Sequence, residues 1–127
     1  MTDLRASYDA YLACLNARDW DDLGHHVHPD VEHNGQTLGV AGYRSMLEDD
    51  VAAIPDLRFD VELLVVQAPR LAARLTFDCT PAGELFGVHV DGSHVRFSEN
   101  VFYLYRDDKI ASVWSVVDRA AVWEQMG

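Results

Sequence analysis

The chain has 127 residues, a mass of 14.3 kDa and a formal net charge of −11, because 21 acidic side chains outnumber 10 basic ones. Apolar residues make up 49% of the sequence, which excludes disorder and predicts a single domain, residues 1–127, with a buried core. Nucleic acids and anionic membranes are bound by clusters of Lys and Arg, so we expect neither as a partner.

The N-terminal part of the chain predicts two helices. Thr2 and Asp3 can cap a first helix, whose apolar residues recur at helical spacing as far as Leu15. A short second helix is expected over residues 19–27, and Pro29 would end it. No basic start followed by an apolar block is present, so we expect a cytoplasmic protein.

Four histidines stand in ten positions at the end of this second helix, at 25, 26, 28 and 33. A catalytic zinc site needs three ligands at about 2 Å and an open position. Pro29 interrupts the run, so we expect solvated histidines at a helix end and no metal site. His33 follows the apolar Val31 by two residues, which predicts that its ring can face a pocket.

The rest of the chain predicts one more helix, a set of strands and a terminal helix. Residues 40–54 carry apolar side chains at helical spacing. The period then changes to two, and Asp118 can cap a helix over 119–126. Strands are predicted over residues 31–34, 57–65, 71–79, 95–106 and 110–117, with a loop and a possible short strand at 80–92.

A chain in which helices come first and a mostly antiparallel meander of strands comes last has the α+β pattern. A curved sheet packed on the helices would leave a pocket at its concave face. Cys14 and Cys79 sit in apolar patterns, so we expect two buried thiols and no disulfide.

Several short motifs follow one another in a particular order. They are HPD (28–30), HN (33–34), IPD (54–56), GELFG (83–87), DG (91–92), DKI (108–110), Trp114, Asp118 and EQMG (124–127). In this order and spacing the chain resembles the SnoaL-like polyketide cyclases, or ester cyclases, of the NTF2-like superfamily. The resemblance covers nearly the whole chain, and it depends on the order of the motifs because no single motif is specific.

This resemblance implies a cone-shaped α+β barrel with a deep, partly apolar pocket, and a homodimer formed through the outer face of the sheet. Cyclases of the family close a ring by intramolecular aldol condensation, without metal or cofactor, and use an aspartate as general acid/base. That aspartate lies on the last strand, five residues after the position of Ile110, where this chain has Ser115. Tyr103 stands where the cyclases have a pocket histidine.

Epoxide hydrolases of the same fold offer a second comparison. They need an Asp-Arg-Asp relay, and Arg74 matches its arginine. Thr76 and Ser115 stand where the two acids belong, so the sequence disfavours this chemistry.

The candidate catalytic residues are His33, Glu99, Tyr103 and Asp118. Glu99 and Tyr103 share a strand face with Val101, and a carboxylate on an apolar wall has a raised pKa, so Glu99 can replace the missing base. Tyr103 would stabilise an oxyanion and His33 would shuttle a proton or donate to a carbonyl. Asp118 is a reserve acid, for which helix capping is the favoured role.

The candidate substrate-binding residues are Asn34, Arg74, Trp114 and Ser115. Asn34 can equally be a turn residue before Gly35. Arg74 can hold a substrate carboxylate, although an ion pair with an internal acid such as Glu99 is the favoured use. Trp114 can belong to the core, an interface or the pocket wall.

The sequence therefore predicts cofactor-free acid/base chemistry next to a carbonyl, of the cyclase, isomerase or lyase (hydratase) type, on a small and partly apolar molecule. A non-catalytic binding module of the same fold is the alternative. A pure dimerisation domain is a third possibility.

Overall fold

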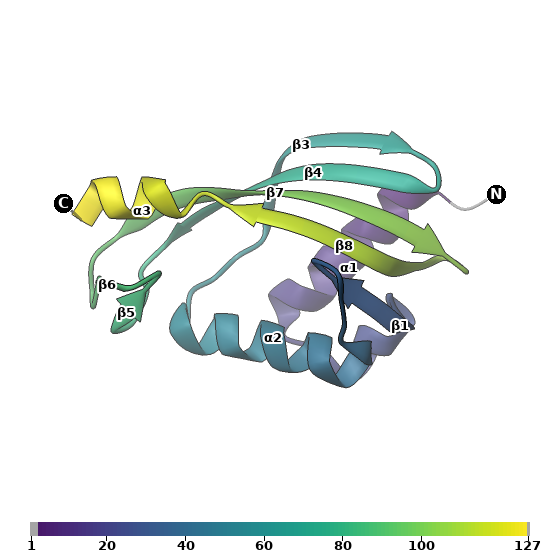
Figure 1. Cartoon of the computed structure of the whole chain (residues 1–127), viewed down its shortest axis with the longest axis horizontal. Coiled ribbons are helices and arrows are strands. Elements are labelled where there is room, and N and C mark those ends of the chain that lie inside the picture. The colour runs from purple at the N-terminus through teal and green to yellow at the C-terminus, as the bar shows by residue number, and fades with distance from the viewer. Residues whose placement is uncertain (1–2, 127) are drawn as a thin grey trace.

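The structure is a computed structural model that describes residues 3–126, so Thr2 and the Gly127 of the EQMG motif lie outside the described residues. A curved sheet forms one layer and two helices pack against one of its faces (Figure 1). The helices are α1 (Leu4–Ala17), the 3₁₀-helix η1 (Trp20–His25), α2 (Gly39–Ala53) and α3 (Arg119–Met126). The strands are β1 (Val27–His33), β2 (Gln36–Thr37), β3 (Asp60–Gln67), β4 (Arg70–Cys79), β5 (Glu84–Leu85), β6 (Val88–His89), β7 (Val95–Arg106) and β8 (Lys109–Val117).

The main sheet has the strand order β2-β1-β8-β7-β4-β3, and β5 and β6 form a separate small hairpin. Among the described strands, β1 and β8 pair in parallel and the other neighbours pair antiparallel. The predicted α+β architecture, with helices packed on a curved and mostly antiparallel sheet, is confirmed. None of the described helices is long and apolar enough to cross a membrane.

Helix α1 begins and packs as its sequence predicts. The Asp3 carboxylate accepts hydrogen bonds from the backbone N–H groups of Arg5 and Ala6, at 3.1 and 3.3 Å. Arg18 ends the helix in the left-handed conformation, and its N–H bonds back to the last turn. The buried face of the helix consists of Leu4, Tyr8, Tyr11, Leu12, Cys14 and Leu15.

The predicted second helix is corrected at its C-terminal end. It is a 3₁₀-helix that ends at His25, and Asp19 makes no capping hydrogen bond through its side chain. Val27 already belongs to β1, which runs through Pro29. Pro29 is tolerated because the pairing of β1 with β8 is irregular between Val27 and Glu32, so the missing N–H interrupts no regular ladder.

The predicted strand over 57–65 begins later and changes face. Leu57 and Phe59 are buried before β3 starts, whereas Leu63 is 61% exposed. The pairing of β3 with β4 shifts between Val61 and Leu63. Such an irregularity reverses the side-chain alternation, so the second half of this apolar pattern points outward.

The central strands follow the predicted alternation. Strand β7 has its expected bounds, 95–106, and pairs with β4 over ten residues from Val95 to Leu104. The buried side chains of β4 are Leu71, Ala73, Leu75, Phe77 and Cys79, as expected. Both cysteines are free and buried, which confirms the predicted thiols.

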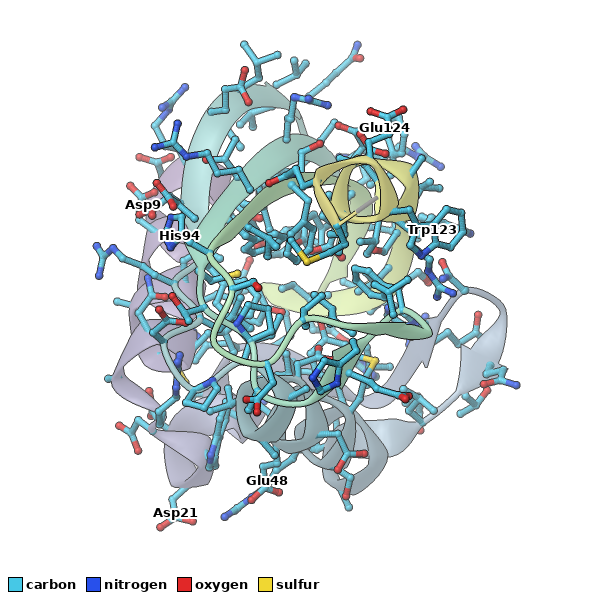
Figure 2. The ribbon with its side chains drawn as sticks, turned by 90° about the vertical axis from the view of Figure 1, so that its left-hand side faces the viewer. Asp9, Asp21, Glu48, His94, Trp123 and Glu124 are labelled. Carbon is cyan, nitrogen blue, oxygen red and sulfur yellow. The ribbon has the colours of Figure 1, made fainter. Side chains whose placement is uncertain are left out.

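The acidic character of the chain lies on its surface. Asp9, Asp21, Glu48 and Glu124 point outward from three different helices and the 3₁₀ turn (Figure 2). The acidic residues Glu99 and Asp50 line the interior cavity described below.

Candidate functional site

A cavity of about 300 Å³ lies between α1, α2 and the concave face of the sheet. Strand β7 contributes Glu99, Val101 and Tyr103, which alternate with residues on the outer face. The remaining lining comes from α1 (Tyr11, Leu12, Leu15), the end of β1 (His33, Asn34), α2 (Tyr43, Met46, Leu47, Asp50), β8 (Val113, Ser115, Val117) and Phe59, Leu75, Phe86 and Arg119.

Glu99 is the less exposed of the two acids that line this cavity. Its burial raises the pKa of the carboxyl above the usual range, and a hydrogen bond from the Ser115 hydroxyl to the carboxylate opposes that shift. The two side chains meet because β7 and β8 pair with Glu99 opposite Val117 and Val101 opposite Ser115. Glu99 can therefore take up and release a proton closer to neutral pH than an exposed glutamate does.

His33 stands at the end of β1 and lines the cavity. Its ring lies against Tyr43, with the ring centroids 6.4 Å apart and the planes nearly perpendicular. Burial lowers the pKa of His33, because the charged imidazolium loses hydration there. A neutral imidazole can accept one proton and donate another, which suits a relay between the cavity and solvent.

Asn34 acts on the site through Ser115. Its side-chain oxygen accepts a hydrogen bond from the Ser115 N–H at 2.8 Å, and its side-chain N–H₂ donates to the Ser115 carbonyl at 3.2 Å. Asn34 itself is in the left-handed conformation, with φ of 48°, which asparagine tolerates. The amide thus joins β1 to β8 and fixes the serine that contacts Glu99.

Four tyrosines form two hydroxyl pairs beside the cavity. The Tyr8 and Tyr103 hydroxyls are 3.0 Å apart, and those of Tyr11 and Tyr43 are 2.6 Å apart. Burial raises the pKa of all four phenols, so they keep their protons at neutral pH. In each pair one hydroxyl donates to the other, and the second hydroxyl can donate its own hydrogen to a negatively charged oxygen without being deprotonated by it.

Asp50 is an acid of the cavity that the sequence reasoning missed. It is exposed on α2, yet its carboxylate borders the cavity, where burial and then the charge of Glu99 raise its pKa to about 6. A sequence signal existed, because Asp50 follows Tyr43 by seven residues and Leu47 by three, which places it on the buried stripe of the helix.

Three predicted site residues lie away from this cavity, which corrects their placement. Arg74 is on the outer face of the sheet, where it contacts Glu62 and Asn100 at 3.1 Å each, and its predicted partner Glu99 faces the other way. Trp114 also lies on the outer face and is 46% exposed.

Asp118 is the third of these residues, and its carboxylate accepts a hydrogen bond from the Ala121 N–H at 3.2 Å. It therefore caps α3, which is the role that the sequence favoured.

The histidines expected at a helix end do not gather around a common point. His25 and His26 both contact Asp22, at 2.6 and 3.0 Å. His28 instead accepts a hydrogen bond from Arg106 at 3.4 Å and has Asp107 3.6 Å away. The early imidazoles are thus held by neighbouring carboxylates and one arginine.

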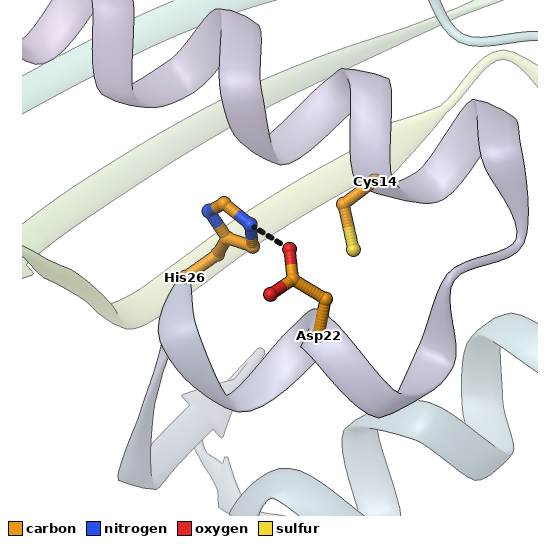
Figure 3. Close-up of side chains that lie close together, drawn as sticks. All are labelled: Cys14, Asp22 and His26. Carbon is orange, nitrogen blue, oxygen red and sulfur yellow. Dashed lines mark hydrogen bonds and ion pairs between the residues drawn. The ribbon is translucent and has the colours of Figure 1, made fainter.

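One group of metal-type side chains is close together, namely Cys14, Asp22 and His26, whose ligand atoms lie within 4.8 Å of one another (Figure 3). The Cys14 thiol donates to the Asp19 carbonyl at 3.1 Å, and burial, with nearby acids, raises its pKa to about 11. A metal ligand must be the thiolate. Within the described residues, hydrogen bonds account for this cluster.

Comparison with known proteins gives a consistent family and fold. The family model of the SnoaL-like polyketide cyclases matches residues 5–126. The crystal structure of a SnoaL-like polyketide cyclase from Agrobacterium tumefaciens str. C58 is 50% identical over 100% of both chains, with a TM-score of 0.97.

More distant structures share the fold. AclR, a putative hydroxylase from Streptomyces galilaeus, is 24% identical over 98% of this chain and 95% of its own, with a TM-score of 0.80. IdmH, a putative polyketide cyclase from Streptomyces antibioticus, is 19% identical over 99% of each chain, with a TM-score of 0.86. Among curated proteins, none matches the chain significantly.

Proposed function

Because the chain belongs to the SnoaL-like polyketide cyclase family, we propose that it catalyses cofactor-free acid/base chemistry next to a carbonyl group of a small, partly apolar molecule. The observation that carries this proposal is Glu99, a largely buried carboxyl with a raised pKa that faces a cavity lined by hydroxyl donors. Cyclase, isomerase and lyase reactions of this type share one first step. A base removes a proton from the carbon beside the carbonyl, and the oxygen gains negative charge.

Glu99 is the base in this proposal. The family resemblance places the usual aspartate at Ser115, and the Ser115 hydroxyl contacts the Glu99 carboxylate from the neighbouring strand. The carboxylate therefore reaches the region of the missing acid although it comes from β7. Its raised pKa makes it a stronger base than an exposed glutamate once it is ionised.

Tyr103 stabilises the developing oxyanion, with Tyr8 as its hydrogen-bond partner. One well-placed donor of this kind contributes about 3–4 kcal/mol to a transition state. His33 and Asp50 border the cavity and have pKa values shifted toward each other, downward for the imidazole and to about 6 for the carboxyl. In this proposal they carry the proton from Glu99 to solvent and from solvent back to Glu99.

The experiment uses 3-methyl-2,4-pentanedione, which has one acidic hydrogen between two carbonyls. Exchange of this hydrogen for deuterium is followed by NMR in D₂O, above the rate without protein. We expect Glu99→Gln to lower the catalysed rate by about 10²–10⁴-fold, because the amide cannot accept the proton. Glu124→Gln, on the surface of α3, is the matched control and should exchange at the wild-type rate.

Equal rates for the two variants would contradict the role of Glu99. If the diketone binds but its hydrogen exchange is not accelerated, the alternative function holds, and the protein is a non-catalytic binding module with the same cavity.

We further propose that two copies of the chain associate through the outer face of the sheet. Val65, Ala72, Phe102 and Trp114 are successive cross-strand partners, so they form one apolar row over four strands. Phe102 is 61% exposed. An apolar row of this kind on a soluble protein marks an interface.

Sedimentation velocity tests this association. Phe102→Glu should convert the dimer to a monomer, whereas Ala10→Glu, which adds the same charge to the exposed side of α1, should leave it dimeric. A wild-type protein that sediments as a monomer at high micromolar concentration would rule the dimer out.

A further inference from the structure

A second, smaller cavity of about 110 Å³ adjoins the main one. The two cavities share five lining residues, namely Asp50, Phe59, Phe86, Glu99 and Val117. Beyond them the smaller cavity is lined by apolar side chains alone, from Ala53, Ile54, Leu57, Phe77, Leu85 and Phe97. We call it the Phe chamber. Its two acidic residues, Asp50 and Glu99, therefore stand where it meets the main cavity.

Four phenylalanine rings in series form the wall of the Phe chamber. The ring centroids are 5.7 Å apart for Phe59 and Phe77, 5.0 Å for Phe77 and Phe97, and 5.5 Å for Phe97 and Phe86. The first and last of these contacts are edge-to-face, which is the favoured geometry of aromatic pairs. Each ring of this wall thus packs against at least one other ring of the series.

The last ring of the series is held in place at some cost. Phe86 lies in the turn between β5 and β6 with φ of 52°, a left-handed conformation that is unfavourable for a bulky residue. Helix α3 holds this turn, because the Trp123 indole N–H donates to the Phe86 carbonyl at 2.9 Å. The Arg119 guanidinium also lies 5.3 Å from the ring centre.

We propose that the Phe chamber is a substrate subsite, which binds a short apolar substituent on the carbon that Glu99 deprotonates. This inference rests on the proposed function for the identity of the reacting carbon. The carbonyl part of the substrate would occupy the main cavity beside the tyrosine hydroxyls, and the substituent would extend past Glu99. The substrate class is thus a carbonyl compound that carries an alkyl group on the carbon next to the carbonyl.

The size of the Phe chamber limits the substituent. A water molecule in the liquid occupies about 30 Å³, so 110 Å³ accommodates roughly four groups of that size. A propyl or butyl group fits, whereas a hexyl group does not. Because the lining beyond the two acids is apolar, a charged or hydroxylated substituent would leave its polar atoms without partners.

The test measures binding without turnover, in protein that carries Glu99→Gln. The probes are 3-alkyl-2,4-pentanediones with methyl, ethyl, propyl, butyl and hexyl groups, titrated by NMR. We expect the Kd to fall by about fourfold for each methylene up to propyl or butyl, because each one leaves water. The hexyl probe should bind no better than the butyl probe.

Two pairs of variants locate the effect. Ala53→Leu fills the Phe chamber, so the butyl probe should lose more than tenfold in affinity while the methyl probe changes by less than twofold. Ala52→Leu, the exposed neighbour on α2, is its control. Ile54→Val adds room for one carbon and should extend the gain by one methylene. Ile110→Val is the same change at a buried position away from both cavities.

Two results would overturn the subsite: affinity that does not depend on chain length, or equal losses in Ala52→Leu and Ala53→Leu. If thermal unfolding shows that Ala53→Leu is not folded, the comparison of Ile54→Val with Ile110→Val decides whether the Phe chamber is the subsite. Failure of the proposed function would look different. Hydrogen exchange would then be insensitive to Glu99→Gln, while the dependence on alkyl length persisted.

Discussion

The two faces of strands β7 and β8 have opposite characters. The concave face carries three polar residues, of which Tyr103 is buried and Glu99 and Ser115 are partly buried. The convex face carries Phe102, Trp114 and Val116, which are apolar and 61, 46 and 71% exposed. At these positions the usual distribution of polar and apolar side chains between inside and outside is reversed, although Val101 and Val113 keep the concave face apolar between them.

These positions carry the two proposals made above, a substrate at the inner face and a second copy of the chain at the outer face. A protein that needed only stability would place apolar residues inside and polar ones outside on these strands. Here polar groups are buried beside a cavity, where their pKa values shift, and apolar groups are exposed in a row, where a partner can cover them. Since side chains alternate along a strand, one rigid sheet positions both surfaces.

The largest expected effect on stability comes from truncating a buried side chain of the inner face. Tyr103→Ala removes a ring that is 3% exposed and leaves the Tyr8 hydroxyl without its partner, so the free energy of unfolding should fall by about 3–5 kcal/mol. Its neighbour on the outer face is the matched comparison, and Phe102→Ala should cost the monomer less than about 1 kcal/mol. Urea unfolding measures both.

The losses of stability in the two variants should also differ in how they depend on protein concentration. The loss in Phe102→Ala should grow as the concentration rises, because the proposed dimer of the wild type would gain stability from association. The loss in Tyr103→Ala should be independent of concentration. Equal losses at high dilution would show that the two faces do not differ as their exposures indicate.

The sequence predicted the inner face of these strands well. The alternation of β7 placed Glu99 and Tyr103 on one face, and both border the cavity. Ser115 was placed there by the family resemblance, as the match of the cyclase aspartate, and it also borders the cavity. The two positions on β7 were predictable because a strand has only two faces and the long apolar pattern of β7 fixes which one is buried.

Other positions were not predictable, for physical reasons. Trp114 is apolar but exposed, and hydropathy cannot separate a core residue from an apolar residue on the surface. The bulge in β3 moved Leu63 outward, and nothing in the local pattern announces a register shift. Asp50 was missed because a charged residue on a helix usually faces solvent. Arg74 was expected beside an internal acid, but its partner is Glu62 on the neighbouring strand.

A smaller effect should follow from changing Ser115 on the inner face. Its hydroxyl stabilises the ionised form of Glu99, so Ser115→Ala should raise the pKa of that carboxyl further. Glu99 is then ionised only at higher pH. The pH range over which the rate of hydrogen exchange rises should therefore move upward. Ser112 lies two positions after Ile110, on the opposite face of β8 from Ser115. Ser112→Ala should therefore leave the pH dependence of the exchange rate unchanged. A profile unmoved by Ser115→Ala would mean that Glu99 is not the titrating base.

The smallest expected effect concerns Asp50 and the dependence of stability on pH. An aspartate in the unfolded chain has a pKa of about 3.9, whereas burial and the charge of Glu99 raise that of Asp50 to about 6. Between these two values the folded state binds more protons than the unfolded state, so stability falls as the pH rises from about 4 to 6.

Above pH 6 the loss due to Asp50 is complete, and below pH 4 it is absent. Asp50 is exposed at the rim, so solvent screening limits the loss to about 1 kcal/mol. Asp50→Asn removes this titration and should therefore be more stable than the wild type by about that amount at pH 7.5, with little difference at pH 4. Asp9→Asn, on the exposed side of α1, does not border the cavity and should show no such trend. Thermal unfolding at both pH values distinguishes the two variants. Identical behaviour of the pair would place Asp50 with the solvated acids of the outer surface, and only Glu99 would then remain as an acid of the inner face.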